Sequence, residues 1–197
     1  MIASGIVCVL AALSLFIYNK LVSYHAGKFS EEGVAELKKV CFPENTDDQS
    51  QLSDNKAEAD DNVSKPGMDT LTVKEYDFIG YLSIPALRLE LPVMAEWSYD
   101  NLELSPCCYS GSPENDDFVI AAHNYSSHFG FISDLKVGDK VTFTDVNAHR
   151  IDYRVELIDT LSPGDIKDMT SGEYDLTMFT CTYSGQARVT VRCNRER

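Results

Sequence analysis

The sequence predicts a mainly β fold, a closed or nearly closed antiparallel barrel that follows an apolar segment and a polar connection. Three observations lead to this prediction. Residues 2–18 contain no charged side chain, and residues 44–69 are acidic with almost no large apolar side chain. From residue 71 onward, short apolar and β-branched runs alternate with turn residues, a spacing typical of all-β domains. A chain of 197 residues has room for one such domain and its appendages.

The N-terminal segment indicates where the protein resides. Ile2–Tyr18 is rich in Ile, Val, Leu, Ala and Phe, and its length is at the short end of the roughly 17–25 residues that span a bilayer. We therefore predict a membrane anchor over residues 1–24. A cleaved signal peptide is one alternative, although no basic stretch precedes the segment and no clear A-x-A site follows it. A buried core helix is the other, but such helices usually carry a polar face.

Between the anchor and the barrel, residues 25–70 are predicted to hold a short helix and a flexible acidic stalk. The helix is indicated by apolar residues at near-helical spacing, namely Phe29, Val34, Leu37 and Val40. From Glu44 to Asp69 the side chains are too polar to bury the surface that would offset the entropy of ordering. We assign this stalk no binding role, because a charged run is usually just solvated.

Composition and cysteine spacing exclude several classes of function. The formal net charge of -14 and the pI near 4.6 argue against nucleic-acid binding, which needs a basic face. The six cysteines show no CxxC spacing, so we expect no structural zinc, no other metal and no cofactor. They also form no spaced disulfide framework, because Cys8 lies in the apolar segment and Cys107 and Cys108 are adjacent.

The barrel is predicted to occupy residues 71–197, a length that can bury a single core. Its strands are expected at residues 78–84, 89–94, 118–122, 140–144 and 151–158, followed by a hairpin near the C-terminus. One helical turn is expected at residues 99–104.

The hairpin carries the first sign of chemistry. Two β-runs, residues 176–182 and 187–193, are separated by a small turn that contains Ser184-Gly185. If these two residues are the centre of the turn, Cys181 lies opposite Arg188, with Cβ atoms roughly 4.5–5.5 Å apart. A guanidinium beside a thiol favours the nucleophilic thiolate. Cys181 is therefore a candidate nucleophile.

Four histidines could assist a thiolate: His25, His123, His128 and His149. His123 directly follows the apolar run Val119-Ile-Ala-Ala122, so it projects where a core strand meets a loop, a rigid position for a catalytic group. Simpler interpretations stay open at this point. His123 could cap a loop, Cys181 could be buried and inert, and Arg188 could be a solvated strand residue.

Taken together, these residues resemble the sortase family of Gram-positive bacteria. The order is that of the family, with Ala122-His123-Asn124 first, Thr180-Cys181 next and Arg188 seven positions later. The family's Thr-Leu-x-Thr-Cys motif stands here as Thr177-Met-Phe-Thr180-Cys181, with a volume-conserving Met in place of Leu. Two further segments also match, residues 79–85 and 131–139.

The resemblance implies an eight-stranded, mixed β-barrel and a cysteine transpeptidase that acts on a sorting motif similar to LPxTG. Cys181 would attack the carbonyl before the scissile bond and form a thioester acyl-enzyme. His123 would protonate the leaving amine and later deprotonate the incoming one. Arg188 would stabilise the developing oxyanion. Thr180 and Asn124 are expected to contact the substrate.

Arg192 is the alternative to Arg188 within the family pattern. We prefer Arg188 because it faces Cys181, whereas Arg192 pairs with Thr177, about 13 Å further along the strand.

The resemblance also implies partners and a location. The partners are secreted proteins with LPxTG-like sorting signals, an amine of a peptidoglycan precursor or of a pilin lysine, and the membrane, but no nucleic acid. The catalytic domain would lie outside the cell on a single-pass anchor, against the weak cytoplasmic bias of Lys20 and Lys28.

A housekeeping or class D-like subtype is favoured by three features. Residues 162–174 have no room for a long helix, no apolar segment follows Cys193, and no Asp-Pro-Phe/Trp lid motif precedes Phe78. Two other functions stay open: a membrane-tethered β-barrel binding module without catalysis, and a plain cysteine hydrolase.

Overall fold

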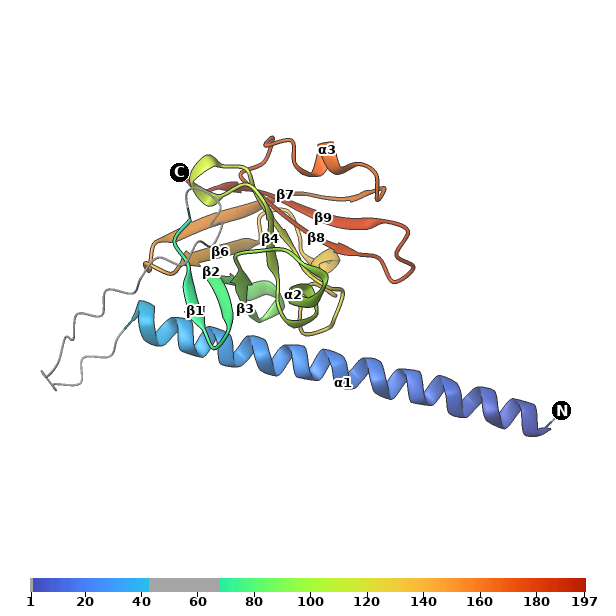
Figure 1. Cartoon of the computed structure of the whole chain (residues 1–197). Coiled ribbons are helices and arrows are strands. Elements are labelled where there is room, and N and C mark those ends of the chain that lie inside the picture. Colours follow the sequence, from blue (N-terminus) through green and yellow to red (C-terminus); the bar gives the residue numbers. More distant parts are fainter. Residues whose placement is uncertain (1, 43–67) are drawn as a thin grey trace, which may run out of the picture.

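The computed structural model describes residues 2–42 and 68–197, which form a long N-terminal helix and a β-barrel (Figure 1). The α-helices are α1 (Ile2–Cys41), α2 (Tyr99–Leu104) and α3 (Ile166–Met169). The strands are β1 (Leu71–Val73), β2 (Tyr76–Ile84), β3 (Leu89–Met94), β4 (Cys107–Ser110), β5 (Phe118–Ala121), β6 (Lys140–Asp145), β7 (Arg150–Leu161), β8 (Leu176–Cys181) and β9 (Arg188–Arg195). Short 3-10 helices lie in three connections: η1 (Pro85–Leu87), η2 (Pro113–Asn115) and η3 (Ile132–Asp134).

Eight strands close into a barrel in the described part of the chain. The sheet order is β1-β2-β3-β4-β5-β8-β9-β7-β6, and pairing of β2 with β6 closes the ring. The short strand β1 pairs antiparallel with the first residues of β2. The β3–β4 and β5–β8 pairs are parallel and the others antiparallel. Gly80 permits the closure, because a Cβ there would lie 2.1 Å from the carbonyl oxygen of Thr144 on β6. This architecture confirms the predicted eight-stranded barrel, and its two parallel pairs make it mixed, where the spacing of the strands alone predicted an antiparallel barrel.

The expected strands coincide with β2, β3, β5, β6, β7 and the final hairpin, and the expected helical turn is α2. Two strands were not predicted. β4 is only four residues long and follows Pro106, so no alternating pattern marks it. β1 is a three-residue extension that depends on its pairing with β2.

Apolar side chains gather in two clusters, one inside the barrel and one on its outer face. The inner cluster draws on strands around the whole ring, with Phe118, Phe143 and Tyr153 among its largest members. The outer cluster joins the sheet to the helices, since it contains Leu37 of α1 and Leu102 of α2 beside residues of β2, β5 and β8. Successive strand residues therefore alternate between the two clusters.

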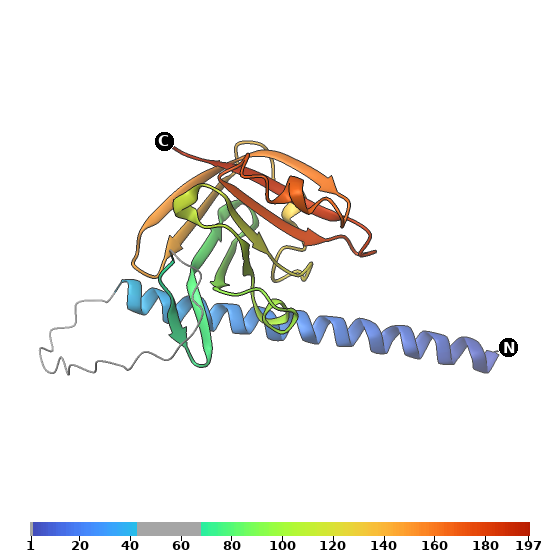
Figure 2. The ribbon, with the colours of Figure 1, turned by 45° about the horizontal axis from the view of Figure 1, so that its top comes forward.

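The apolar segment and the amphipathic segment that follows it form one continuous helix, α1. Its N-terminal part is exposed and projects beyond the barrel (Figures 1 and 2), and it is long and apolar enough to cross a membrane. Its C-terminal part packs on the barrel, where Ala26, Val34 and Leu37 are 2%, 5% and 0% exposed. The predicted stalk, residues 44–69, lies outside the described residues except for its last two.

Candidate active site

Strand register brings the three predicted catalytic residues to one level of the sheet. Cys181, the last residue of β8, pairs directly with Arg188, the first residue of β9. On the other side of β8, the parallel partner of Phe179 is Ala121, and the same register carried two residues further sets His123 beside Cys181. Neighbouring strands lie roughly 4.8 Å apart. Three adjacent chain segments therefore carry His123, Cys181 and Arg188 at one level of the sheet.

Side chains along β8 alternate between the inner and the outer face of the barrel, and this alternation places Thr180 and Cys181 on opposite faces. Phe179 belongs to the outer cluster and Met178 to the inner one, so Cys181 lies on the outer face. Thr180 is 4% exposed on the inward face, and its hydroxyl has no hydrogen-bond partner among the described residues. The structure thus does not bring the Thr180 side chain to the face of Cys181. Its predicted contact with substrate has no support from this geometry.

Cys181 differs from the other barrel cysteines in its accessibility. It is free and partly exposed, whereas Cys107, Cys108 and Cys193 are buried. Burial raises the pKa of the Cys107 thiol to about 12, and it also raises the pKa of Cys193. Among the described residues of the barrel, Cys181 is therefore the cysteine that an external electrophile can reach.

The two arginines of β9 have different surroundings. Arg188 is half-buried, and its Nη1 donates only long hydrogen bonds, 3.4 Å to the Gly185 carbonyl and 3.3 Å to its neighbour at 187. Arg192 is 3% exposed and donates to Thr177 Oγ1 and to carbonyl oxygens of residues 168 and 169. Arg192 also lies 3.6 Å from Asp159. It ties the α3 segment to the sheet, which leaves Arg188 as the cation next to Cys181.

The turn between β8 and β9 differs in detail from the prediction. The amide of Gly185 donates to the Thr182 carbonyl at 2.8 Å, so Tyr183 and Ser184 are the central residues and Gly185 adopts a φ of 71°. The loop is one residue longer on each side than a two-residue turn. The Cys181–Arg188 register is the same in both cases, because the change is symmetric.

His123 is the second residue after the end of β5 and is half-buried. Its ring stacks on Tyr125 with centroids 4.8 Å apart. Burial lowers the pKa of His123 below its ordinary value, and the nearby Glu103 carboxylate acts in the opposite direction. Asn124 follows in the same loop and is also half-buried, and its predicted contact with substrate stays a prediction.

A second histidine in this loop was not assigned a role from the sequence. His128 is 0% exposed, and its Nε2 forms a 3.3 Å hydrogen bond with Ser30 Oγ of α1. Burial lowers the pKa of His128 to about 4, with a further contribution from the neighbouring His123. The signal that could have indicated this contact is the set of small residues at helical spacing on α1, namely Ser23, Ala26, Gly27 and Ser30.

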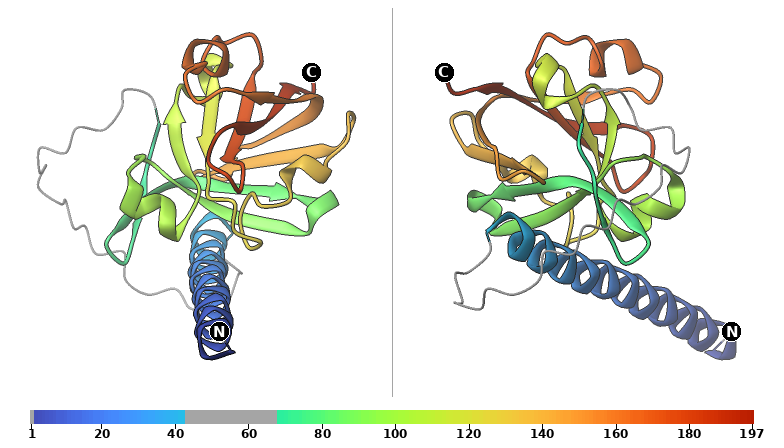
Figure 3. Two further views of the ribbon diagram at one scale, coloured as in Figure 1. Left: turned by 90° about the vertical axis from the view of Figure 1, so that its right-hand side faces the viewer. Right: turned by 60° about the vertical axis from the view of Figure 1, so that its left-hand side comes forward.

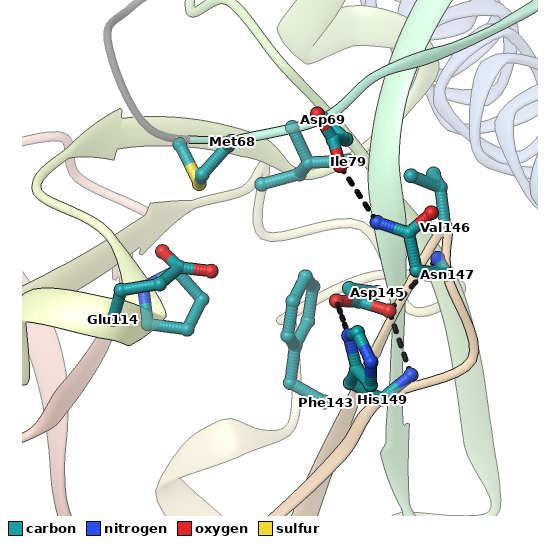
Figure 4. A pocket seen from close by; sticks show the side chains of 10 residues that line it. Met68, Asp69, Ile79, Glu114, Phe143, Asp145, Val146, Asn147 and His149 are labelled. Atoms are coloured by element: carbon teal, nitrogen blue, oxygen red, sulfur yellow. Dashed lines mark hydrogen bonds and ion pairs between the residues drawn. The ribbon is translucent and has the colours of Figure 1, made fainter.

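His149 belongs to a different part of the surface. Its Nδ1 lies 2.9 Å from Asp145 Oδ2, and Asn147 Nδ2 donates to Asp69 at 2.8 Å (Figure 4). These residues line a small hollow over β6, which shares no lining residue with β8, β9 or the segment after β5. His149 is therefore not part of the cysteine site.

The comparisons with known proteins identify the family. A model of the sortase domain matches residues 82–196. The chain belongs to the sortase family. It is 29% identical over 109 residues to sortase A of Bacillus anthracis, a match that covers 52% of this chain and 51% of that protein. The chain thus spans about half the length of the curated relative that it matches.

Solved structures of sortases named A and C resemble this one. Sortase C1 from Streptococcus agalactiae is 30% identical with a TM-score of 0.55, over 61% of this chain and 68% of that one. Sortase A from Corynebacterium diphtheriae is 26% identical with a TM-score of 0.57, over 62% of each chain. Structures of both named classes thus resemble this chain to a similar degree.

Proposed function

We propose that this sortase is a membrane-anchored cysteine transpeptidase with Cys181 as its nucleophile, His123 as its general acid and base, and Arg188 as its oxyanion-binding group. The observation that supports this most is the strand register, because Cys181 pairs with Arg188 and the β5–β8 register, continued two residues past the end of β5, puts His123 at the level of Cys181. The family pattern and the accessibility of Cys181 point in the same direction.

In the first half-reaction, the Cys181 sulfur attacks the carbonyl carbon at the scissile bond of an LPxTG-like sorting motif. A C–S bond forms as the C–N bond breaks, and His123 gives its proton to the departing amine. The negative charge on the carbonyl oxygen is met by Arg188, whose present hydrogen bonds to the turn are long and are easily exchanged for a bond to substrate.

In the second half-reaction, an amine attacks the thioester. His123 accepts the proton of the amine, the C–S bond breaks, and Cys181 is regenerated. The acceptor that we propose is an amine of a peptidoglycan precursor, or the lysine of a pilin. The donors are secreted proteins that carry the sorting motif.

The helix supports a location at the cell surface. Residues 2–18 are apolar and Ser23 is the first buried residue of α1 among those whose burial is described, so little chain separates a membrane-spanning segment from the domain. The β8–β9 hairpin and the N-terminal end of α1 face the same side of the molecule (Figure 3). We propose a single-pass anchor with the catalytic domain outside the cell and its site turned toward the bilayer.

The test uses the full chain in detergent micelles, because α1 is packed on the barrel. We expect a panel of LPxTG-type peptides to give a thioester adduct by intact mass, and an added amine to convert it into a transfer product. A Cys181→Ala variant should form no adduct. Absence of any adduct across the panel would favour the non-catalytic binding module, and hydrolysis unaffected by added amine would favour the plain hydrolase.

A further inference from the structure

The helix α1 contacts the segment that carries His123. We call residues 123–130 the His123 loop. Ser23 Oγ lies 3.1 Å from Ser126 Oγ, and the Ser127 hydroxyl donates to the Ser23 carbonyl at 2.8 Å. One turn further along, Gly27 approaches Ser127 so closely that a Cβ on the glycine would lie 3.0 Å from that of the serine. The small residues of α1 thus allow the loop to lie directly against the helix.

The third contact of this helix face is buried. Ser30, 1% exposed, forms the 3.3 Å hydrogen bond with His128 Nε2 across 98 residues of sequence. The backbone of Ala26 on α1 and of Leu104 at the end of α2 also interacts with the His128 ring. His128 is therefore enclosed between two helices and the loop. Its Nδ1 is buried without a hydrogen-bond partner among the described residues, so the bond from Nε2 to Ser30 is the hydrogen bond that fixes the orientation of the ring.

Two routes lead from His128 to His123. The backbone route runs through the next residue, since the amide of Phe129 donates to the carbonyl oxygen of His123 at 3.1 Å. The side-chain route runs through Tyr125, whose ring centroid lies 5.5 Å from that of His128 and 4.8 Å from that of His123. A displacement of His128 would therefore be transmitted to both the backbone and the ring of His123.

We propose that α1 positions the His123 imidazole through the Ser30–His128 contact, so that the anchor helix is part of the catalytic unit as well as a membrane tether. Ser30 and His128 are positioning residues that touch no reacting atom. The inference rests on the proposed role of His123. It implies that a barrel cut free of α1 keeps Cys181 and Arg188 in register, because β8–β9 pairing is independent of the helix, but loses the placement of His123.

A purely structural role for α1 is the competing interpretation, and the helix offers a matched control. Val34 is buried at 5% exposure and belongs to the outer cluster with Phe78 and Met94. Its replacement by alanine loosens the docking of α1 without touching the His123 loop. Ser30→Ala removes one hydroxyl from the same helix and leaves the apolar contact intact.

The experiment compares wild type, Ser30→Ala and Val34→Ala as full chains in phosphatidylcholine nanodiscs. We expect Ser30→Ala to lower kcat about tenfold, with KM changed less than about twofold, because only proton transfer is misplaced. The pKa of His123, measured by NMR on isotope-labelled protein, should rise toward the ordinary histidine value as the loop becomes more exposed to solvent. Val34→Ala should lower thermal stability while kcat and the His123 titration stay near wild type.

The outcomes separate this inference from the proposed function. If wild type transfers no peptide, the proposed function fails, and the His123 titration still decides whether α1 positions the ring. If wild type is active and Ser30→Ala matches it in both kcat and titration, the inference is wrong. Equal losses in Ser30→Ala and Val34→Ala would also overturn it, since they would indicate general loosening of the helix.

Discussion

The two halves of the candidate site are built in different ways. Cys181 and Arg188 lie on the β8–β9 hairpin, where pairing of adjacent strands sets their register. His123 lies in a loop whose Ser126 and His128 are hydrogen-bonded to Ser23 and Ser30 of α1, about a hundred residues earlier in the chain. The hairpin half is therefore local and self-sufficient, while the histidine half depends on a distant element.

The difference predicts where the protein tolerates substitutions. Antiparallel pairing holds the hairpin along its whole length, and β7 supports β9 from the other side. In the His123 loop, the amides of His128, Phe129 and Gly130 donate to carbonyl oxygens of the loop itself, and the bond to the Phe179 carbonyl comes from Ala122, the residue before the loop. Substitutions in the hairpin should affect chemistry or stability separately, whereas substitutions in the loop should affect both together.

The largest effect is expected from the two cysteines of the hairpin. Cys181→Ala should lower the transpeptidation rate by about 10⁴-fold or more, because no other group can form the thioester. Cys193 pairs with Leu176 inside the barrel and is 0% exposed. Cys193→Ala should cost about 1–2 kcal/mol of stability with activity within a few-fold of wild type. Peptide-transfer assays and denaturant titrations of both variants check this separation, and substantial transfer by Cys181→Ala would refute the assignment of the nucleophile.

The two arginines of β9 give the next largest contrast. Arg188→Ala should lower kcat/KM about 10²- to 10³-fold through the loss of oxyanion stabilisation, with an unchanged unfolding midpoint. Arg192→Ala should instead destabilise the barrel by about 3 kcal/mol, because it leaves Asp159 and the α3 carbonyl oxygens without their buried partner. Steady-state kinetics and chemical denaturation distinguish the two, and the reverse assignment of effects would identify Arg192 as the functional cation.

The same contrast explains how much of the site could be predicted from the sequence. The Cys181–Arg188 pair could be predicted because residues on both arms of a hairpin are related by counting from the turn. The turn itself was predicted wrongly, since Tyr183 and Ser184, and not Ser184 and Gly185, form its centre. The Cys181–Arg188 pairing was still correct, because the loop is longer by one residue on each side. The closed barrel could be predicted from strand spacing and the family motif, while β4 was missed because it is too short to alternate.

The contact between Ser30 and His128 could not be predicted, because it joins elements with no sequence relationship. The anchor and the short helix were predicted as separate segments with a stalk after them. The structure joins them as α1, and its barrel-facing surface includes small and polar residues that a search for large apolar side chains passes over. The sequence also could not show that Thr180 faces the inside of the barrel, because that depends on which side of β8 packs against the inner cluster.

The protein should lose stability at acidic pH because of His128, which lies in the histidine half of the site. The pKa of His128 is about 4 in the folded protein, below its ordinary value near 6.5. Between these values the unfolded chain binds a proton that the folded protein does not, so stability is complete above about pH 6.5 and falls as the pH drops toward 4. The maximum loss is about 3 kcal/mol. Denaturant titrations from pH 7 to 4 should show this slope in wild type and a flatter one in His128→Gln, and parallel slopes would contradict it.

The smallest expected effects come from one glycine in each half. A Cβ on Gly130 would lie 2.7 Å and 2.8 Å from the carbonyl oxygens of Tyr125 and Asn124, so Gly130→Ala must displace the backbone of the His123 loop. We expect a transpeptidation rate about tenfold lower and a loss of about 1–2 kcal/mol in the free energy of unfolding.

Gly185 has open space around its Cβ position but a φ of 71°, so Gly185→Ala should lower the free energy of unfolding by about 1 kcal/mol. Its rate should stay within about twofold of wild type, because strand pairing beyond the turn holds Cys181 and Arg188. Kinetics and thermal melts of the two alanine variants test this directly. A larger rate loss in Gly185→Ala than in Gly130→Ala would show that the hairpin, and not the loop, is the more sensitive half.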